Sequence, residues 1–126
     1  SATREGDDSV DVDVIDRWHK ARGWSGCGYH FVVLLDGTIQ FGRPVHKIGA
    51  HVKGENVRSI GVCYIGGVEK DGKTPKDTRT SEQIASLLEV FRFLQKCFPG
   101  STIHGHNEFS TKACPSFNVQ LEYGKL

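Results

Sequence analysis

The sequence predicts a single domain of the α/β or α+β class, with a central mixed β-sheet flanked by helices. Its 126 residues fall within the size range of one domain. Two segments carry apolar residues at helical spacing, and strand-like segments alternate with them along the chain. With 37% hydrophobic and 25% charged residues, the chain lies outside the composition of disordered proteins and is expected to fold around its own core.

Two helices are expected. Val12, Ile15 and Trp18 form an apolar stripe that predicts a short amphipathic helix ending near residues 22–23. The second helix is longer and begins after residues 80–83, Thr-Ser-Glu-Gln, which have the form of a capping box. Its apolar residues follow the i, i+3, i+4, i+7 pattern: Ile84, Leu87, Leu88, Phe91 and Leu94. It is expected to close near residues 98–100.

The strand signals are shorter. Residues 29–35 and 38–41 flank Asp36-Gly37, which predicts a β-hairpin with a type I′ turn. Residues 60–65 form an apolar, β-rich run that predicts a buried strand. A further short strand is expected at residues 102–104, and the polar residues 1–10 are expected to form a loop.

Charge and composition narrow the partners and the compartment. Sixteen basic and fifteen acidic residues, without a Lys/Arg run, give no field suited to nucleic acid. No apolar run approaches the roughly 18 residues that span a bilayer, and the polar start lacks a signal-peptide core. The four cysteines show no CxxC pairing, which favours thiols in a reducing cytoplasm. Three of them, Cys27, Cys63 and Cys97, are expected to be small buried residues. A monomer is the default expectation.

His106 and Cys114 are the strongest candidates for metal ligands. Both lie in an irregular segment that follows a predicted strand, and an imidazole with a thiolate suits tetrahedral zinc. The spacing between them is not that of a standard zinc finger, and a lone cysteine is often only a packing residue. A catalytic zinc usually takes three protein ligands, so a third is needed from elsewhere.

Several sequence blocks resemble one family in order along nearly the whole chain, from Ser1 to about Tyr123. The blocks are Gly28-Tyr29-His30-Phe31, Asp36-Gly37-Thr38, Gly49-Ala50-His51 with Lys53-Gly54, Ser59-Ile60-Gly61-Val62-Cys63, His106-Asn107-Glu108 and Lys112-Ala113-Cys114-Pro115-Ser116-Phe117. They are similar to the small phage lysozymes that are N-acetylmuramoyl-L-alanine amidases, and to the bacterial type 2 amidases and animal peptidoglycan recognition proteins.

The resemblance implies one zinc ion held by two histidines and a cysteine, of which His106 and Cys114 are two. In the family the remaining histidine belongs to a first strand that ends in a His-Cys-Ser-Ala-Thr type motif. Because this chain begins Ser1-Ala2-Thr3, that histidine is expected immediately upstream of Ser1. The single amidase domain, residues 1–126, is therefore expected to be N-terminally incomplete, without its first strand, and to bind zinc weakly or not at all.

The resemblance also implies roles for other side chains. Tyr29 and Lys112 match the family's tyrosine and lysine that flank the zinc and assist the reaction. Judged without the resemblance, Tyr29 is a half-buried aromatic residue and Lys112 a solvated charge. His51, Asn56 and His30 are candidates to line the groove for muramyl peptide, although satisfied polar residues are an equally good interpretation.

The function implied is zinc-dependent hydrolysis of the amide bond between N-acetylmuramic acid and L-alanine in bacterial peptidoglycan. The protein would act as a prophage endolysin or in wall remodelling, and would stay in the cytoplasm until released to the cell wall. The alternative is a non-catalytic module that binds muramyl peptide. Cys114 favours catalysis, because relatives that only recognise peptidoglycan commonly lack that cysteine.

Overall fold

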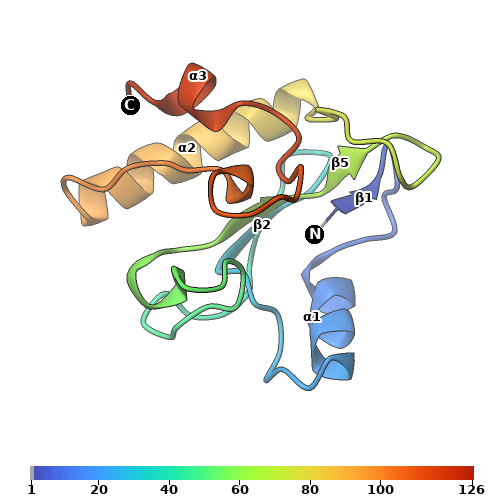
Figure 1. The fold of residues 1–126 in the computed structure, drawn as a ribbon, viewed down its shortest axis with the longest axis horizontal. Coiled ribbons are helices and arrows are strands. Elements are labelled where there is room, and N and C mark those ends of the chain that lie inside the picture. Colours follow the sequence, from blue (N-terminus) through green and yellow to red (C-terminus); the bar gives the residue numbers. More distant parts are fainter. Residues whose placement is uncertain (1) are drawn as a thin grey trace.

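The computed structural model describes residues 2–126 and shows a small mixed α/β fold, as the sequence predicts (Figure 1). Along the chain the strands are β1 (Ala2–Arg4), β2 (Phe31–Val33), β3 (Ile39–Phe41), β4 (Val62–Tyr64) and β5 (Gly66–Val68). The α-helices are α1 (Val12–Ala21), α2 (Ser81–Cys97) and α3 (Val119–Tyr123), with two 3₁₀ turns at Asn56–Arg58 and His106–Glu108. In the part of the chain that the structure describes, no helix is long and apolar enough to cross a membrane.

The strands form a mixed arrangement in which β4 and β5 are consecutive. One sheet has the order β3-β2-β4, with β2 antiparallel to β3 and parallel to β4. Only Ile65 separates β4 from β5, and β5 pairs in parallel with β1, which lies beside it in Figure 1. Among residues 2–126, β4 has a strand partner on one side only.

Helices pack on both faces of the β2-β4 pair because successive side chains of a strand point to opposite faces. Val32, Cys63 and Ile65 face α1 and form a core cluster with its Ile15. Val33 and Tyr64 face the other way and pack with Leu87 of α2. The core is therefore divided by the sheet, with α1 on one side and α2 on the other.

The hairpin is confirmed, but its turn is not type I′. A type I′ turn needs positive φ at two successive residues, and here only Gly37 has it, at φ +88°. Leu34 N–H donates to the Thr38 carbonyl at 2.9 Å, which closes a three-residue loop instead of a two-residue one. The Asp36 carboxylate accepts from Thr38 N–H at 2.9 Å and so favours the longer turn.

Three further expectations were wrong, and the first two concern strands, which depend on partners far away in the chain. Residues 2–4 are a strand because they pair with β5, although their composition favours a loop. Residues 102–104 are not assigned as a strand, since no strand among the described residues pairs with them. Cys97 is exposed at the end of α2 rather than buried.

The capping box at the start of α2 is confirmed, and one of its members also joins the helix to the sheet. The Thr80 hydroxyl accepts from Gln83 N–H at 3.0 Å, and the Gln83 side-chain oxygen accepts from Thr80 N–H at 2.9 Å. Gln83 is fully buried, and its Nε2 donates to the carbonyls of Ile65 at 2.9 Å and Val33 at 3.3 Å. One amide therefore fixes α2 against the ends of two strands.

Replacing Gln83 by leucine tests this junction. The variant leaves two buried carbonyls and one N–H without their partner, so we expect a loss of about 2 kcal/mol in the free energy of unfolding. Urea unfolding measures it, with Glu82→Ala, an exposed change in the same turn, as the control that costs little. A loss in Gln83→Leu no larger than that in the control would contradict the assigned role.

Candidate active site

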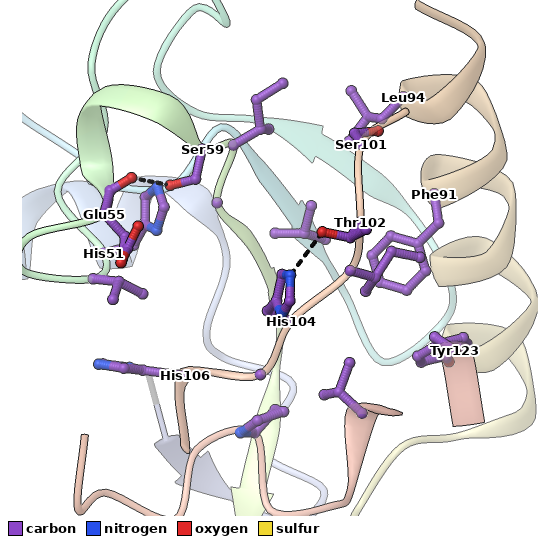
Figure 2. A pocket seen from close by; sticks show the side chains of 18 of the residues that line it. His51, Glu55, Ser59, Phe91, Leu94, Ser101, Thr102, His104, His106 and Tyr123 are labelled. Atoms are coloured by element: carbon purple, nitrogen blue, oxygen red, sulfur yellow. Dashed lines mark hydrogen bonds between the residues drawn. The ribbon is translucent and has the colours of Figure 1, made fainter. Parts of the chain in front are cut away.

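A cavity of about 780 Å³ lies between α2, β4 and residues 100–106. Its wall on the α2 side is apolar, with Leu87, Phe91 and Leu94. The opposite end carries the polar side chains that the sequence singles out: Tyr29, His51, His106 and Cys114. Figure 2 shows His51 and His106 on one side of the pocket and Phe91 and Leu94 across from them.

His106 and Cys114 are brought together at this polar end. His106 opens the 3₁₀ turn His106–Glu108, whose start is fixed by Gly105 N–H donating to the Glu108 carboxylate at 2.6 Å. Asn107 N–H donates to the Cys114 carbonyl at 2.7 Å, which ties the two segments to each other. The two side chains predicted as ligands therefore line the same cavity.

The electrostatics of the two side chains differ. Burial lowers the pKa of His106, and the Lys112 ammonium lowers it further, so the imidazole is neutral near pH 7, the form that binds zinc. Burial raises the pKa of the Cys114 thiol. A metal cation would act in the opposite direction and favour the thiolate.

The described residues do not complete a metal site. Residues 2–126 contain no group of three or more His, Cys, Asp or Glu side chains placed to hold a metal ion. His106 and Cys114 supply two donors of the right chemistry, whereas a catalytic zinc usually takes three from the protein. These residues therefore fit zinc only together with a third donor.

His51 is held in a space that two glycines provide. A Cβ at Gly61 would lie 2.4 Å from the His51 ring, and one at Gly49 would lie 2.6 Å from it. The Asn56 side-chain oxygen accepts from the N–H groups of His51 at 3.0 Å and Val52 at 2.9 Å, which fixes the loop. Asn56 thus positions His51, and direct contact of Asn56 with substrate stays a prediction.

The His51 ring is half-buried and neutral near pH 7. Burial, with smaller effects from His30 and His106, lowers the pKa of His51 to about 4. Its Nε2 is buried without a hydrogen-bond partner among the described residues. Because a buried polar atom without a partner is costly, this nitrogen is suited to a hydrogen bond with a bound ligand.

His30 has a different place from the one expected. It is 1% exposed and is not among the residues that line the cavity. Its Nε2 donates to the Lys47 carbonyl at 2.8 Å, and its Nδ1 accepts from Gly61 N–H at 3.0 Å. Both ring nitrogens therefore serve the backbone, and a substrate contact for His30 stays a prediction.

Tyr29 lies in the cavity wall, whereas Lys112 is not among the residues that line the cavity. The Tyr29 ring stacks near His51 with 6.3 Å between centroids, and its carbonyl accepts from Arg43 N–H at 2.8 Å. Lys112 is exposed and acts on the pKa of His106. Tyr29 is thus near His51, and Lys112 is close enough to His106 to affect its pKa. Roles for Tyr29 and Lys112 in the reaction stay predictions.

Two residues that support the site were not found by sequence analysis. The Tyr64 hydroxyl donates to the Pro115 carbonyl at 2.6 Å, next to Cys114. Arg79 packs its guanidinium on the Phe117 ring. Neither contact leaves a signal in the sequence, because the partners are 51 residues apart for the first pair and far apart in the chain for the second.

The burial of His51 predicts a pH dependence of stability. Its pKa is 6.5 in the unfolded chain and about 4 in the fold, so between these values only the unfolded chain binds the proton. The free energy of unfolding therefore falls as the pH drops from about 6.5 to about 4. Across this window we expect the free energy of unfolding of His51→Gln to fall by about 1 kcal/mol less than that of the wild type. Urea unfolding at both pH values measures the difference, and equal losses would show that the imidazole is not protected from protonation.

Comparisons with known proteins agree on one family. The Amidase_2 family, described as N-acetylmuramoyl-L-alanine amidase, matches residues 2–117. The endolysin of Enterobacteria phage K11 is 42% identical over 120 residues, which cover 95% of this chain and 78% of that protein.

Solved structures are similar in fold as well. An endolysin N-acetylmuramoyl-L-alanine amidase, LysCS from Clostridium intestinale, matches with a TM-score of 0.78 at 32% identity, covering 91% of this chain and 72% of that one. The peptidoglycan recognition protein ectodomain complex of LCa and LCx, bound to tracheal cytotoxin, matches with a TM-score of 0.74 at 26% identity, covering 86% and 67%. With a family match over most of its length and a phage endolysin at this identity, the chain belongs to the N-acetylmuramoyl-L-alanine amidase family.

Proposed function

We propose that this protein is a zinc-dependent amidase that hydrolyses the bond between N-acetylmuramic acid and L-alanine in peptidoglycan. The observation that carries the proposal is the meeting of His106 and Cys114 at the polar end of the 780 Å³ cavity, inside the region that matches the amidase family. An imidazole that is neutral near pH 7 and a thiol are suitable donors for zinc.

We further propose that the third zinc ligand comes from residues that precede Ala2. In the β1-β5 register Ala2 pairs with Gly66 in parallel, and β4 runs directly into β5. A chain that continued this register upstream of Ala2 would pass Tyr64 and Val62, along the side of β4 that has no strand partner among residues 2–126. Val62, Tyr64 and residues 101–104 line the large cavity, so such a strand would run along its wall.

Two observations support this path. Ala2 lines a second, small cavity of about 50 Å³ together with Tyr29, Tyr64 and Cys114, so the upstream path starts beside the proposed ligand. Residues 102–104, which have strand-like sequence but no strand neighbour among the described residues, would gain one. A histidine close to Ala2 on this path would reach the polar end of the cavity.

The side chains of this chain have separate tasks in the proposed reaction. Zinc, when bound, polarises the amide carbonyl and lowers the pKa of a water molecule. Tyr29 and Lys112 carry a phenol and an ammonium that can donate hydrogen bonds to the oxyanion that develops on the carbonyl. His51 offers its unpartnered Nε2 to a polar group of the muramyl peptide. Cys114, as a metal ligand, would not act as a nucleophile.

A second candidate is a module that binds muramyl peptide without cutting it. It is favoured by the similarity to the LCa and LCx recognition proteins, whose solved structure holds tracheal cytotoxin, and by the two-donor set in residues 2–126. The cavity itself suits either function, because both need a groove for the same ligand.

The setting of the protein follows from the enzyme proposal. The relatives named endolysin support a protein that waits in the cytoplasm and is released to the cell wall. A monomer stays the default expectation. Peptidoglycan is then the expected partner.

Lys112→Ala and Tyr29→Phe test the enzyme proposal in a form that carries the upstream strand of an endolysin relative. Each should lower kcat by about 10² to 10⁴, because a group that donates to the transition state is lost, and each should leave bound zinc in place. The measurement is mass spectrometry of muropeptides, which follows release of peptides with a free L-alanine amino group. Lys125→Ala, an exposed lysine near the C-terminus, is the matched control and should not change the rate.

The same experiment separates the two candidates. If the unchanged extended protein binds muropeptides but releases no free peptide, the enzyme proposal is wrong and the binding module stands. If it cleaves, and Lys112→Ala cleaves equally fast, Lys112 has no part in the reaction.

A further inference from the structure

We infer that Arg79 is a positioning residue for the candidate active site. Its buried guanidinium packs on Phe117 and bonds to α3, and so fixes residues 114–117. Arg79 with Asp77, Glu122, Tyr123 and Phe117 is called the clamp. The inference rests on the proposed function in one respect only, that Cys114 is a zinc ligand. Arg79 lies outside every sequence block that resembles the amidase family, in the turn that precedes α2.

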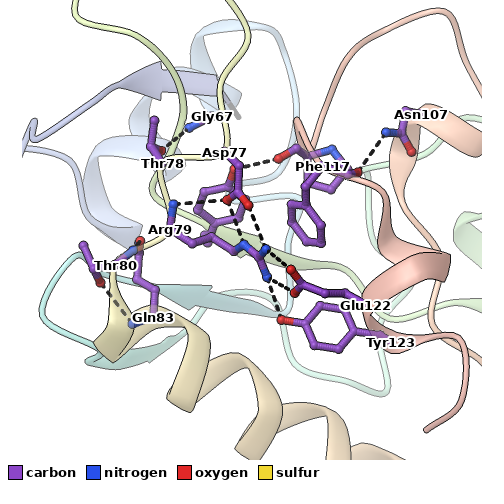
Figure 3. Close-up of polar contacts among 12 residues, drawn as sticks. Gly67, Asp77, Thr78, Arg79, Thr80, Gln83, Asn107, Phe117, Glu122 and Tyr123 are labelled. Atoms are coloured by element: carbon purple, nitrogen blue, oxygen red, sulfur yellow. Dashed lines mark hydrogen bonds and ion pairs between the residues drawn. The ribbon is translucent and has the colours of Figure 1, made fainter.

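The Arg79 side chain is only 2% exposed, and all five N–H groups of its guanidinium donate hydrogen bonds. Nε and Nη2 donate to the two oxygens of Asp77 at 2.9 and 2.8 Å. Nη1 and Nη2 donate to the two oxygens of Glu122 at 2.6 and 2.7 Å. The fifth bond goes from Nη1 to the Tyr123 hydroxyl at 2.8 Å (Figure 3).

These partners come from two separate parts of the chain. Asp77 belongs to the same turn as Arg79, whereas Glu122 and Tyr123 belong to α3. Two forked ion pairs on one cation have a fixed geometry, because the planar guanidinium matches each carboxylate along one edge. The guanidinium holds the pKa of both carboxyls below their usual range, so the cluster stays charged near neutral pH. Arg79 therefore fixes α3 against the start of α2.

The flat face of the same guanidinium covers Phe117. The Arg79 carbon Cζ lies 3.6 Å from the centre of the Phe117 ring. Phe117 in turn packs on Tyr123 at 6.0 Å and Tyr64 at 6.3 Å between centroids. Phe117 and Tyr123 both line the large cavity, so the clamp sets part of its wall.

Phe117 ends the short segment that begins with Cys114. Hydrogen bonds that do not involve Arg79 hold the backbone of this segment. Tyr64 donates to the Pro115 carbonyl, the Ser116 hydroxyl donates to the Gly67 carbonyl at 2.7 Å, and Asn107 Nδ2 donates to the Phe117 carbonyl at 3.2 Å. Ser116 has φ +70°, a conformation that costs free energy and persists only where its surroundings hold it.

Arg79 supplies what these backbone contacts do not, because it fixes the Phe117 side chain. Asp77 and Glu122 are 39% and 46% exposed, so only the cation of these ion pairs is buried. Desolvation of the guanidinium offsets much of the attraction, and the pairs define one geometry more than they add net stability. Loss of the guanidinium is therefore expected to loosen the segment around Cys114 more than the fold as a whole.

The four cysteine thiols make this measurable without zinc or substrate. Alkylation by iodoacetamide at fixed pH, followed by mass spectrometry of each cysteine peptide, reports local opening at each thiol. In Arg79→Met we expect Cys114 to react about ten times faster or more, which corresponds to the loss of hydrogen bonds to a charged group. Cys27 and Cys63, buried in the core beside α1, should keep their rates, and the exposed Cys97 serves as the internal reference.

Ile15→Ala is the matched control, because Ile15 is fully buried on α1 with Cys27 and Cys63 and has no contact with the clamp. It destabilises the whole fold, so Cys27, Cys63 and Cys114 should accelerate together. Arg79→Lys and Glu122→Gln keep more of the cluster, and each should accelerate Cys114 selectively by a smaller factor. These two variants decide the question if Arg79→Met does not fold.

Two results would overturn the inference: an unchanged Cys114 rate in all three clamp variants, or equal acceleration of Cys27, Cys63 and Cys114 in them. The second would make Arg79 a general stabilising residue. Because the assay needs neither metal nor turnover, its outcome is independent of whether the protein proves to be an amidase.

Discussion

The buried amide of Gln83 bonds to the carbonyls of Ile65 and Val33, where two parallel strands end. This contact locks β4 beside β2 and places α2 over one face of the pair. β2 follows directly on Tyr29 and His30, and β4 on Gly61, so the same pairing sets the positions of the side chains at the polar end of the cavity. The geometry of the site is well defined because its residues lie next to the ends of a rigid pair of strands.

The polar end of the cavity is built to keep imidazoles neutral. His51 and His106 are both buried enough that their pKa values lie below the ordinary value, and glycines at 49 and 61 leave just the space that the His51 ring needs. A neutral imidazole can bind a metal ion or accept a hydrogen bond through its unprotonated nitrogen, whereas a protonated imidazole can do neither. Burial therefore contributes directly to what the site can do, at the cost of stability in acid.

The local sequence predicts those helices and turns whose stabilising contacts are made between residues close together in the chain. The capping box at Thr80 and the apolar stripe of α2 lie within a few residues of the contacts they make, and the hairpin around Gly37 is closed by its own turn. In contrast, β1 depends on β5, more than 60 residues away, and residues 102–104 have strand-like sequence without a strand beside them in the described part of the chain. Their assignment was wrong because a strand is defined by its neighbour and not by its composition.

Only part of the candidate site could be predicted from the sequence. The pair His106 and Cys114 attracts attention by residue type, but their roles, and those of Tyr29 and Lys112, come from the family resemblance. His30 was a candidate to line the groove, with a satisfied polar residue as the other interpretation, and both of its ring nitrogens bond to the backbone, at Lys47 and Gly61. The Arg79 cluster brings together residues 43 positions apart, and no periodic pattern records such a contact.

The proposed reaction requires that His106 and Cys114 supply two of the three ligands of a zinc site, and that a strand beside β4 supplies the third. The direct test is zinc stoichiometry by elemental analysis of the 126-residue chain and of a form extended upstream of Ser1 with an endolysin relative's strand, each beside its Cys114→Ser variant. We expect one zinc per chain in the extended form, little in the shorter chain, and loss of the metal in the extended Cys114→Ser variant. Equal zinc content in the extended protein and its Cys114→Ser variant would contradict the assignment.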